Sequence, residues 1–255
     1  MERRLALVRR PSPRLAEGLL THLQRQPVDP VRAELQWTAY VEALRAAGWE
    51  VVEAPPAPDC PDSAFVEDTV VVYGDLAVIS RPGALERRPE PEDVEPVLRD
   101  LGYRIARIKD PGTLDGGDVL KHGGTVWVGV GGRTSWAGFE QLAEHLRGLA
   151  DDVIAVPVSL VLHLKSAVTA LPDGTVVGLP ELVDDPGVYP SFLPVPEEHG
   201  GHVVLLGGGR LLMSTSAPDT AELYRGMGYE VVTVDIGEYE KLEGCVTCLS
   251  VRLRG

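Results

Sequence analysis

The segment Leu242-Glu-Gly-Cys-Val-Thr-Cys-Leu-Ser-Val-Arg-Leu253 contains two of the three cysteines of the chain and is rich in apolar and β-branched residues. This composition predicts a β-strand that closes the fold. Residues three apart on a strand point to opposite faces, so we expect the sulfurs of Cys245 and Cys248 to face apart and to share neither a ligand nor a bond. One thiol then packs in the core and the other faces a functional site, and strand parity does not distinguish them. Two buried structural thiols are the simpler interpretation, and a cysteine nucleophile is the alternative.

The start of the chain supplies a partner for this strand, and a repeated pattern lies between the two ends. Residues 3–8, Arg-Arg-Leu-Ala-Leu-Val, form a second strand-like run. Pairs of apolar runs flank turns whose glycines supply the positive φ that hairpins require. Helix-like stretches that end in a glycine and an aromatic residue lead into further strands. The hairpins are expected at 69–80, 118–130, 167–179 and 202–214, and the helix–glycine–strand segments at 44–53, 98–107 and 224–233, with a weaker copy at 134–158.

This repeat predicts a five-bladed α/β propeller, formed by residues 1–255 as one catalytic domain. The first three turn centres lie roughly fifty residues apart, a period typical of arrays of supersecondary units. The hairpins and the paired chain ends together give a ring of five ββαβ units. The third unit departs from the pattern, because 180–196 is proline-rich and is expected to be loop with a little helix.

Composition limits the partner and the compartment. The formal net charge of −14 argues against nucleic acid and anionic membranes, which both favour basic surfaces, and it is compatible with a small cationic substrate. Three cysteines are too few for a disulfide framework and fit a reducing compartment. The N-terminus lacks the apolar core of a signal peptide, and no apolar run reaches the length of a bilayer span. We therefore expect a cytoplasmic protein.

The ring would bring polar residues of separate units to its axis. They are Asp62, Glu67 and Asp68 before the first hairpin, Asp115 and Asp118 before the second, His163 before the third, and Cys248 in the closing strand. If Cys248 is a nucleophile, His163 is the axial base, and the other five histidines are expected at the surface. The alternatives are a hydrogen-bonded core histidine and, for Asp115-Gly-Gly-Asp118, a simple turn, which we favour for Asp118 more than for Asp115.

The acidic cluster before the first hairpin is a candidate cation pocket. Clustered carboxylates at a closed axis raise one another's pKa unless a cation is present, which applies to Asp62, Glu67 and Asp68. Arg87 and Arg133 each follow the outgoing strand of a hairpin, so both are expected at the same mouth. Each arginine alone is more typical of a surface, and the acids alone of a solvated loop. Together they suit a zwitterionic substrate with a cationic far end, since arginine binds a carboxylate bidentately.

In their order, these motifs resemble those of the dimethylarginine dimethylaminohydrolase family, which belongs to the guanidino-group-modifying (pentein) superfamily. The matching motifs are Asp62-Ser-x-Phe-Val-Glu-Asp68, Arg81-Pro-Gly-Ala-x-x-Arg87-Arg88, Leu114-Asp-Gly-Gly-Asp118, Gly132-Arg-Thr134, Leu162-His-Leu-Lys165 and Gly244-Cys-Val-Thr-Cys-Leu-Ser250. The resemblance covers nearly the whole chain. It implies a five-bladed propeller, no cofactor or metal, and hydrolysis of Nω,Nω-dimethyl-L-arginine and Nω-methyl-L-arginine to L-citrulline and dimethylamine or methylamine.

The resemblance also assigns the site residues. It places the nucleophile at Cys248, with Cys245 left to pack, the general acid and base at His163, and the acidic residue that orients it at Asp115. It implies that the substrate is a small cationic amino acid, and a homodimer is compatible with the sequence. The substrate contacts that it implies are Asp62, Glu67, Asp68, Arg87, Arg133 and the backbone carbonyls of Leu19, in a mobile lid over 12–20, and Leu242.

The implied chemistry needs a thiolate, because a guanidinium carbon with its delocalised charge is a poor electrophile. A cysteine pKa of about 8.5 falls beside a cation, and the guanidinium held by Glu67 and Asp68 would be that cation. His163 then protonates the departing amine and later deprotonates the water that cleaves the covalent thiouronium. Three other functions are compatible with these residues: arginine deiminase activity, a non-enzymatic propeller, and a methylarginine-binding protein with slow turnover. Deiminases that resemble this fold usually carry a helical insertion, and a non-enzymatic relative would lack the Cys/His/acid set.

Overall fold

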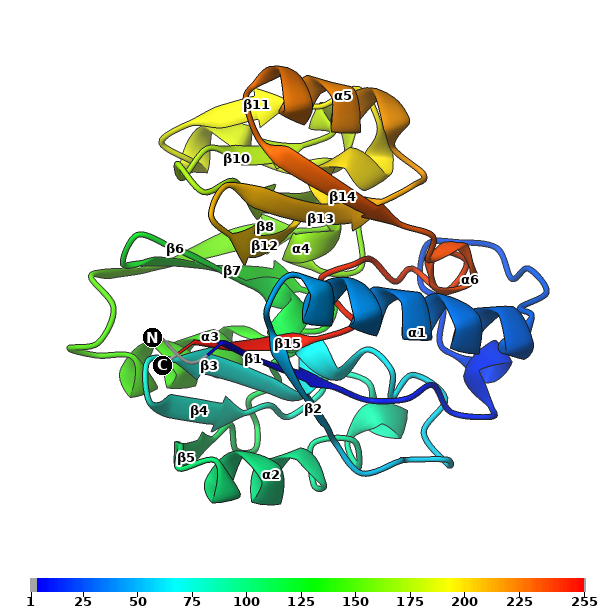
Figure 1. Cartoon of the computed structure of the whole chain (residues 1–255). Coiled ribbons are helices and arrows are strands. Elements are labelled where there is room, and N and C mark those ends of the chain that lie inside the picture. Colours follow the sequence, from blue (N-terminus) through cyan, green and yellow to red (C-terminus); the bar gives the residue numbers. More distant parts are fainter. Residues whose placement is uncertain (1–3, 255) are drawn as a thin grey trace.

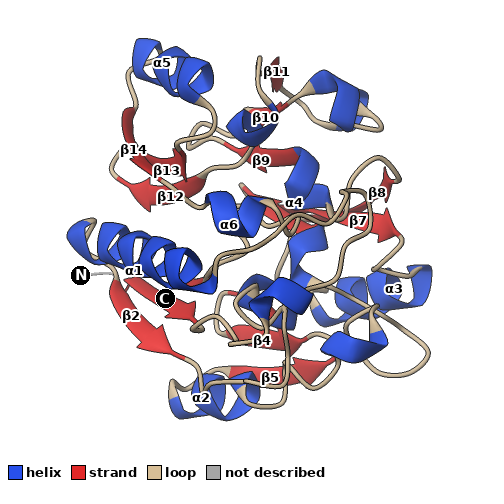
Figure 2. Cartoon of the chain, turned by 90° about the vertical axis from the view of Figure 1, so that its right-hand side faces the viewer, coloured by secondary structure: helices blue, strands red, loops and turns tan. Residues whose placement is uncertain are grey.

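The computed structural model describes residues 4–254, so Arg3 of the first expected strand lies outside the described residues. The strands form five three-stranded sheets, each an antiparallel pair whose second strand pairs in parallel with a third. This arrangement confirms the predicted ring of five units (Figure 1). In four of them an α-helix connects the second and third strands, whereas in the third unit the connection holds only 3₁₀ helices. Figure 2 shows α1, α2, α3 and α5 at the periphery of the strands, with α4 and α6 between them.

The sheets and helices have the following bounds. The strands are β1 (Arg4–Val8), β2 (Glu50–Glu53) and β15 (Val251–Arg254); β3 (Val70–Tyr73), β4 (Leu76–Ile79) and β5 (Arg104–Arg107); β6 (Val119–His122), β7 (Thr125–Gly131) and β8 (Asp152–Val158); β9 (Val168–Ala170), β10 (Val176–Gly178) and β11 (Phe192–Pro194); and β12 (Val204–Gly207), β13 (Arg210–Ser214) and β14 (Glu230–Val234). The α-helices are α1 (Pro30–Ala46), α2 (Val94–Asp100), α3 (Trp136–His145), α4 (Leu164–Ala167), α5 (Pro218–Gly226) and α6 (Gly237–Glu240). The short 3₁₀ helices are η1 (Leu15–Glu17), η2 (Val66–Thr69), η3 (Leu85–Arg87), η4 (Gly116–Asp118), η5 (Pro180–Leu182), η6 (Pro186–Val188) and η7 (Glu198–Gly201).

The chain ends close the ring, as predicted. β1 pairs antiparallel with β15 from Arg4 opposite Arg254 to Leu7 opposite Val251, and the two strands lie side by side in Figure 1. The closing strand is shorter than expected, because it begins only at Val251. The preceding residues form a turn, in which the hydroxyl of Tyr40 on α1 hydrogen-bonds the carbonyl of Val246 and the hydroxyl of Ser250. The carbonyl of Val246 and the hydroxyl of Ser250 thus have a partner in α1 and do not need a neighbouring strand. The segment before Val251 therefore stays outside the sheet despite its strand-like composition.

Local signals set most of the element boundaries. All four expected hairpins are present as β3–β4, β6–β7, β9–β10 and β12–β13. α1, α2 and α5 each stop before a glycine with φ near 90°, at Gly48, Gly102 and Gly228, where a residue with a Cβ would be strained. The weaker copy is also a helix and strand, α3 and β8. The proline-rich region of the third unit contains η5 and η6, and it also contains β11, which the loop interpretation missed.

The apolar interior surrounds the closing turn. One hydrophobic cluster joins Trp37 and Tyr40 of α1 to Phe65, Cys245 and Cys248. The turn that carries both cysteines is therefore packed under the longest helix rather than exposed at the rim of the ring. Within residues 4–254, no helix has the length and apolarity needed to cross a bilayer.

Candidate active site

Four short segments, each before the first strand of a different sheet, meet at one small cavity. Asp68 lies in η2, Asp115 caps η4, His163 caps α4, and Cys248 lies in the turn before β15. The cavity is lined by Leu19, Asp62, Phe65, Asp68, Arg87, Arg133, Leu162, His163, Leu242, Glu243, Gly244 and Cys248. Eight of the ten expected site residues line it, and Asp115 stands behind His163.

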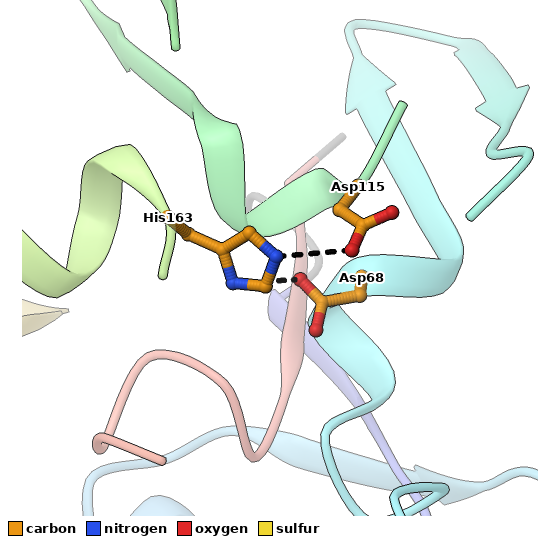
Figure 3. Close-up of side chains that lie close together, drawn as sticks. All are labelled: Asp68, Asp115 and His163. Atoms are coloured by element: carbon orange, nitrogen blue, oxygen red, sulfur yellow. Dashed lines mark hydrogen bonds and ion pairs between the residues drawn. The ribbon is translucent and has the colours of Figure 1, made fainter. Parts of the chain in front are cut away.

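His163 and Asp115 form a buried pair. The Nε2 atom of His163 lies 3.0 Å from an oxygen of Asp115 (Figure 3). The other oxygen of Asp115 accepts a hydrogen bond from the backbone N–H of Gly83 at 2.9 Å. The carboxylate is fully buried and the imidazole almost so. The pair therefore has a fixed orientation, with Nδ1 of the imidazole left on the side of Asp68.

Asp68 lies near the second ring nitrogen of His163, close to Asp115 (Figure 3). Its carboxylate accepts hydrogen bonds from Gly117 N at 2.8 Å and from Arg87 at 2.7 Å, and one oxygen lies 3.8 Å from Nδ1 of His163. A Cβ at Gly117 would lie within 3 Å of both Asp68 and His163, so the glycine permits this approach. Burial disfavours the charge on Asp68, but His163 and Arg87 outweigh it and lower the pKa of Asp68 to about 2.

The surrounding acids keep His163 protonated. Burial disfavours an imidazolium, but Asp68, Asp118 and Asp115 together raise the pKa of His163 to about 9. At neutral pH the imidazole is therefore the acid form.

The ligand atoms of Asp68, Asp115 and His163 lie within 4.8 Å of one another, a spacing that suits a metal ion. Asp68 accepts hydrogen bonds from Gly117 and Arg87, and Asp115 accepts one from Gly83 and pairs with His163. These contacts are those of an acid–base group held in a fixed position.

Asp118 supports this pair from behind. Its carboxylate accepts hydrogen bonds from the hydroxyl of Thr134 at 2.6 Å and from Leu164 N at 2.9 Å, and Asp115 N donates to the same hydroxyl. Burial raises the pKa of Asp118 to about 6. The interpretation of Asp118 as a structural residue of the turn agrees with these contacts.

His202, which was expected at the surface, is buried with Nε2 2.8 Å from the carbonyl of Ser166, so that expectation is wrong.

The two cysteines of the closing turn lie in contact. The sulfurs of Cys245 and Cys248 are 3.3 Å apart, so the expectation that they face apart is wrong. The reason is the local conformation: Cys248 N donates to the carbonyl of Cys245 at 3.0 Å, which closes a turn that brings residues three apart to one side. Cys248 lines the cavity and is almost fully buried. The contact with Cys245 and then burial raise the pKa of its thiol.

Glu67 does not join Asp68 at the cavity. Its carboxylate pairs with Lys165 at 2.6 Å and with Arg252 at 2.8 Å, and it lines a different cavity, of about 270 Å³. Neighbouring residues in a 3₁₀ helix project about 120° apart, so Glu67 and Asp68 of η2 face different surroundings. The structure thus separates Glu67 from the other expected substrate contacts.

The two arginines have different environments. Arg87 is buried, and its guanidinium donates to Asp68 and bidentately to Glu90. Burial opposes its charge, but Glu90 and Asp68 raise its pKa well above the ordinary value. Arg133 donates to Thr21, and its buried Nη1 atom has no hydrogen-bond partner within residues 4–254. Arg133 therefore offers the cavity an unused donor, whereas the donors of Arg87 are engaged.

A segment of the expected lid covers the cavity. Leu19 N donates to both oxygens of Asp62, at 3.2 and 3.1 Å. The cavity under it has a volume of about 10 Å³, at the lower limit for one water molecule, ~10–15 Å³. The start of the expected lid is anchored, because Ser12 hydrogen-bonds the carbonyl of Pro58 at 2.7 Å and Leu15 is fully buried. Substrate entry therefore requires the part after Leu15 to move.

Sequence reasoning missed Glu243, which fastens this segment. Its carboxylate accepts backbone N–H groups of Thr21 at 3.0 Å, of Leu23 at 2.7 Å and of His22. Glu243 has φ of 61°, a strained conformation for a residue other than glycine and one that clusters at functional sites. Phe65, Leu162 and Gly244 were also missed, because apolar residues and glycine at a cavity carry no local signal.

We expect Glu243→Ala to release the covering segment. Three backbone N–H groups lose a charged acceptor worth roughly 1.5–3 kcal/mol per hydrogen bond when well formed, so the closed form is populated less and kcat/KM should fall about tenfold. Hydrogen exchange of the amides of 21–23 should accelerate in the same variant. Glu222→Ala is the matched control, because Glu222 is exposed and pairs with Arg225 on α5. Unchanged exchange at 21–23 would contradict this role.

Comparison with known proteins identifies relatives over the full length. The family model for arginine deiminase matches residues 58–204. The chain is 63% identical over 254 residues to N(G),N(G)-dimethylarginine dimethylaminohydrolase of Streptomyces coelicolor, which covers 100% of this chain and 98% of the relative. It is 33% identical over 252 residues to the protein of the same name from Pseudomonas aeruginosa, covering 96% and 98% of the two chains.

Solved structures agree with these relatives. A cysteine-to-serine mutant of the Pseudomonas aeruginosa protein, complexed with citrulline, is similar with a TM-score of 0.91 and 31% identity, covering 99% of this chain and 100% of that one. A histidine-to-glycine dimethylarginine dimethylaminohydrolase, in an adduct with S-methyl-L-thiocitrulline, is similar with a TM-score of 0.90, 31% identity and the same coverage.

Proposed function

This chain belongs to the dimethylarginine dimethylaminohydrolase family of the pentein superfamily, and from that membership we propose that Cys248 is its nucleophile, His163 its general acid and base, and Asp115 the residue that orients His163. It is an enzyme that hydrolyses Nω,Nω-dimethyl-L-arginine to L-citrulline and dimethylamine. The observation that carries the proposed roles is the closed cavity, which Cys248, His163 and Asp68 line together. Two solved relatives support these roles: the one complexed with citrulline has a cysteine replaced by serine, and the one in an adduct with S-methyl-L-thiocitrulline has a histidine replaced by glycine.

We propose that Asp68 binds the guanidinium and Asp62 the far end of the substrate. Asp68 is ionised across the physiological range, since its pKa is about 2, so it attracts a cation beside Cys248. Burial raises the pKa of Asp62, and an ammonium group at that carboxylate would relieve the cost of its charge. Leu19 and Leu242 line the same cavity, and we propose that their backbone carbonyls accept the remaining ammonium protons. Arg87 acts through Asp68, which it orients.

The reaction then proceeds in two displacements. The guanidinium bound at Asp68 stabilises a thiolate, so the thiol proton of Cys248 passes to solvent water as the substrate binds, since His163 is already protonated. The sulfur attacks the guanidinium carbon, and His163, protonated at neutral pH, donates its proton to the departing dimethylamine. The neutral imidazole next takes a proton from water, whose oxygen attacks the thiouronium carbon. The carbon–sulfur bond breaks, citrulline forms, and Cys248 is regenerated.

One assay tests this reaction directly. Release of citrulline and of the amine is measured side by side from arginine, Nω-methyl-L-arginine and Nω,Nω-dimethyl-L-arginine. We expect dimethylamine release to dominate, and Leu162 and Phe65 at the cavity favour the apolar methyl groups. A preference for free arginine, with ammonia as the product, would instead identify an arginine deiminase activity, the activity for which the matching family model is named.

We propose that Arg133 binds the substrate carboxylate with its unpartnered Nη1 atom. Arg133→Gln should raise the KM for dimethylarginine by roughly 10–100-fold, as expected for loss of a charged hydrogen bond. The KM for the decarboxylated analogue, dimethylagmatine, should hardly change, because it lacks the group that Arg133 binds. Arg147→Gln is the matched control, since Arg147 is exposed and pairs with Glu144. Equal losses on both substrates would show that Arg133 only maintains the fold.

The remaining expectations stay proposals. We infer that the chain acts as one domain, because the nucleophile, the base and the acids come from four of its five sheets. We place the reaction in the cytoplasm, since a cysteine nucleophile must remain a free thiol and reducing compartments maintain it. The substrate is a small amino acid. A homodimer stays a prediction, which the mass measured by light scattering would test.

A further inference from the structure

Cys245 is a buried thiol that the proposed mechanism does not use. Its sulfur lies 3.3 Å from that of Cys248 and 3.1 Å from the hydroxyl of Thr247. We propose that Cys245 is a resolving cysteine: when a peroxide oxidises Cys248, Cys245 forms a disulfide with it, and the enzyme is inactivated reversibly. This inference rests on the proposed function in one respect, which is that Cys248 is the nucleophile.

The turn permits the bond with little backbone movement. Cys248 N donates to the carbonyl of Cys245 at 3.0 Å, and such a turn holds the first and fourth Cα atoms within about 7 Å. Disulfides span Cα separations of about 4.4–6.8 Å and have sulfurs about 2.0 Å apart. Rotation of the two side chains therefore suffices to bring the sulfurs together from their present contact.

The surroundings of Cys245 favour attack by its sulfur. The contact with Cys248 outweighs burial and, with the charge of the nearby His202 and the hydroxyl of Thr247, lowers the pKa of Cys245. A resolving cysteine reacts as the thiolate. Cys248, in contrast, lines the active-site cavity, so a peroxide that enters by the route of the substrate meets Cys248.

The chemistry balances with hydrogen peroxide as the oxidant. The sulfur of Cys248 attacks one peroxide oxygen, the O–O bond breaks, one water leaves, and the sulfur becomes a sulfenic acid. The sulfur of Cys245 then attacks the sulfenic sulfur, the S–O bond breaks, and a second water leaves. Two thiols lose two protons and two electrons in all, and the peroxide receives them. Without Cys245, the sulfenic acid is open to a second peroxide and to irreversible sulfinic acid.

Peroxide titration of three proteins tests the proposal: the native chain, Cys245→Ser, and Cys60→Ser as the control for a thiol outside the closing turn. Each is treated with hydrogen peroxide, assayed for citrulline release, and assayed again after dithiothreitol. We expect the native chain and Cys60→Ser to lose activity and to recover most of it with dithiothreitol. Cys245→Ser should begin with most of the native activity, lose it to peroxide, and recover less than about a tenth.

Peptide mass mapping separates this proposal from the assignment of the nucleophile. The oxidised native chain should contain a Cys245–Cys248 cross-linked peptide with two hydrogens fewer, and Cys245→Ser should instead gain two oxygens on Cys248. Absence of the cross-link, or equal recovery by Cys245→Ser, would overturn the resolving role. If the cross-link forms but citrulline release is not lost, the Cys245–Cys248 disulfide would be established and Cys248 would be refuted as the nucleophile. Cys245→Ala repeats the test if the serine variant folds poorly.

Discussion

Cys248→Ser is expected to abolish citrulline formation, with kcat lowered by at least roughly 10⁴-fold, as for other enzymes that lose a covalent nucleophile. A serine hydroxyl at this place is a far weaker nucleophile, because the cationic guanidinium at Asp68 ionises a thiol much more easily than a hydroxyl. The measurement is citrulline release under substrate saturation, with dimethylamine as a second product. The variant should still bind substrate, since Asp62, Asp68 and Arg133 are untouched.

Cys245→Ser is the matched control for this experiment, because it changes the neighbouring thiol by the same single atom. It should retain most of the citrulline release. The reverse result, an inactive Cys245→Ser and an active Cys248→Ser, would move the nucleophile to the other sulfur. The two sulfurs lie only 3.3 Å apart and Cys248 lines the cavity, so this pair of variants tests directly which sulfur attacks the substrate.

His163→Asn should lower kcat by roughly 10²–10⁴-fold, the usual contribution of a general acid and base. In a single turnover, methanethiol release from S-methyl-L-thiocitrulline should fall much less, because methanethiolate leaves with less need of a proton than an amine does. Citrulline release from the same substrate should stay low, because His163 also activates the water of the second displacement. Asparagine keeps the size of the side chain and a donor toward Asp115. An equal loss of single-turnover methanethiol release and of dimethylamine release would contradict the role of His163 as the acid for the departing amine.

The pH profile gives the same residue a second readout. The pKa of His163 is raised to about 9 by Asp68, Asp118 and Asp115 against the effect of burial, so the acid form is present below that pH and is lost above it. The native kcat should therefore fall as pH rises through about 9. Asp115→Asn removes one of the charges that raise this pKa, so its alkaline limb should shift to lower pH. An alkaline limb that stays in place would disconnect Asp115 from His163.

Much of the fold follows from local sequence signals. Gly48, Gly102 and Gly228 end helices in the sequence because a positive φ is required there, and each does so in the structure. The hairpins follow from apolar runs around glycine turns, and four such pairs plus two strand-like ends leave five units. These signals succeed because turns and helix ends depend on residues close together in the chain.

The site was predicted less completely, for reasons that lie in packing. The closing segment has strand composition, yet Cys245 and Cys248 stand in a turn because the hydroxyl of Tyr40 satisfies its polar groups from α1. Glu67 is acidic like Asp68, but its position in η2 directs it to Lys165 and Arg252. Neither outcome has a signal in the neighbouring sequence, since both depend on groups distant along the chain.

The five units and the closure by the chain ends could be predicted from the amino-acid sequence, and its resemblance to a known family predicted the chemical identity of the site. Three features required the packed fold: which acids face His163, which arginine has a donor without a partner, and the contact between the thiols of Cys245 and Cys248. These features differ in how far along the chain the residues that determine them lie. A glycine turn is set by its own backbone, whereas the direction of a buried charge is set by whichever opposite charge and hydrogen-bond donors the fold packs against it.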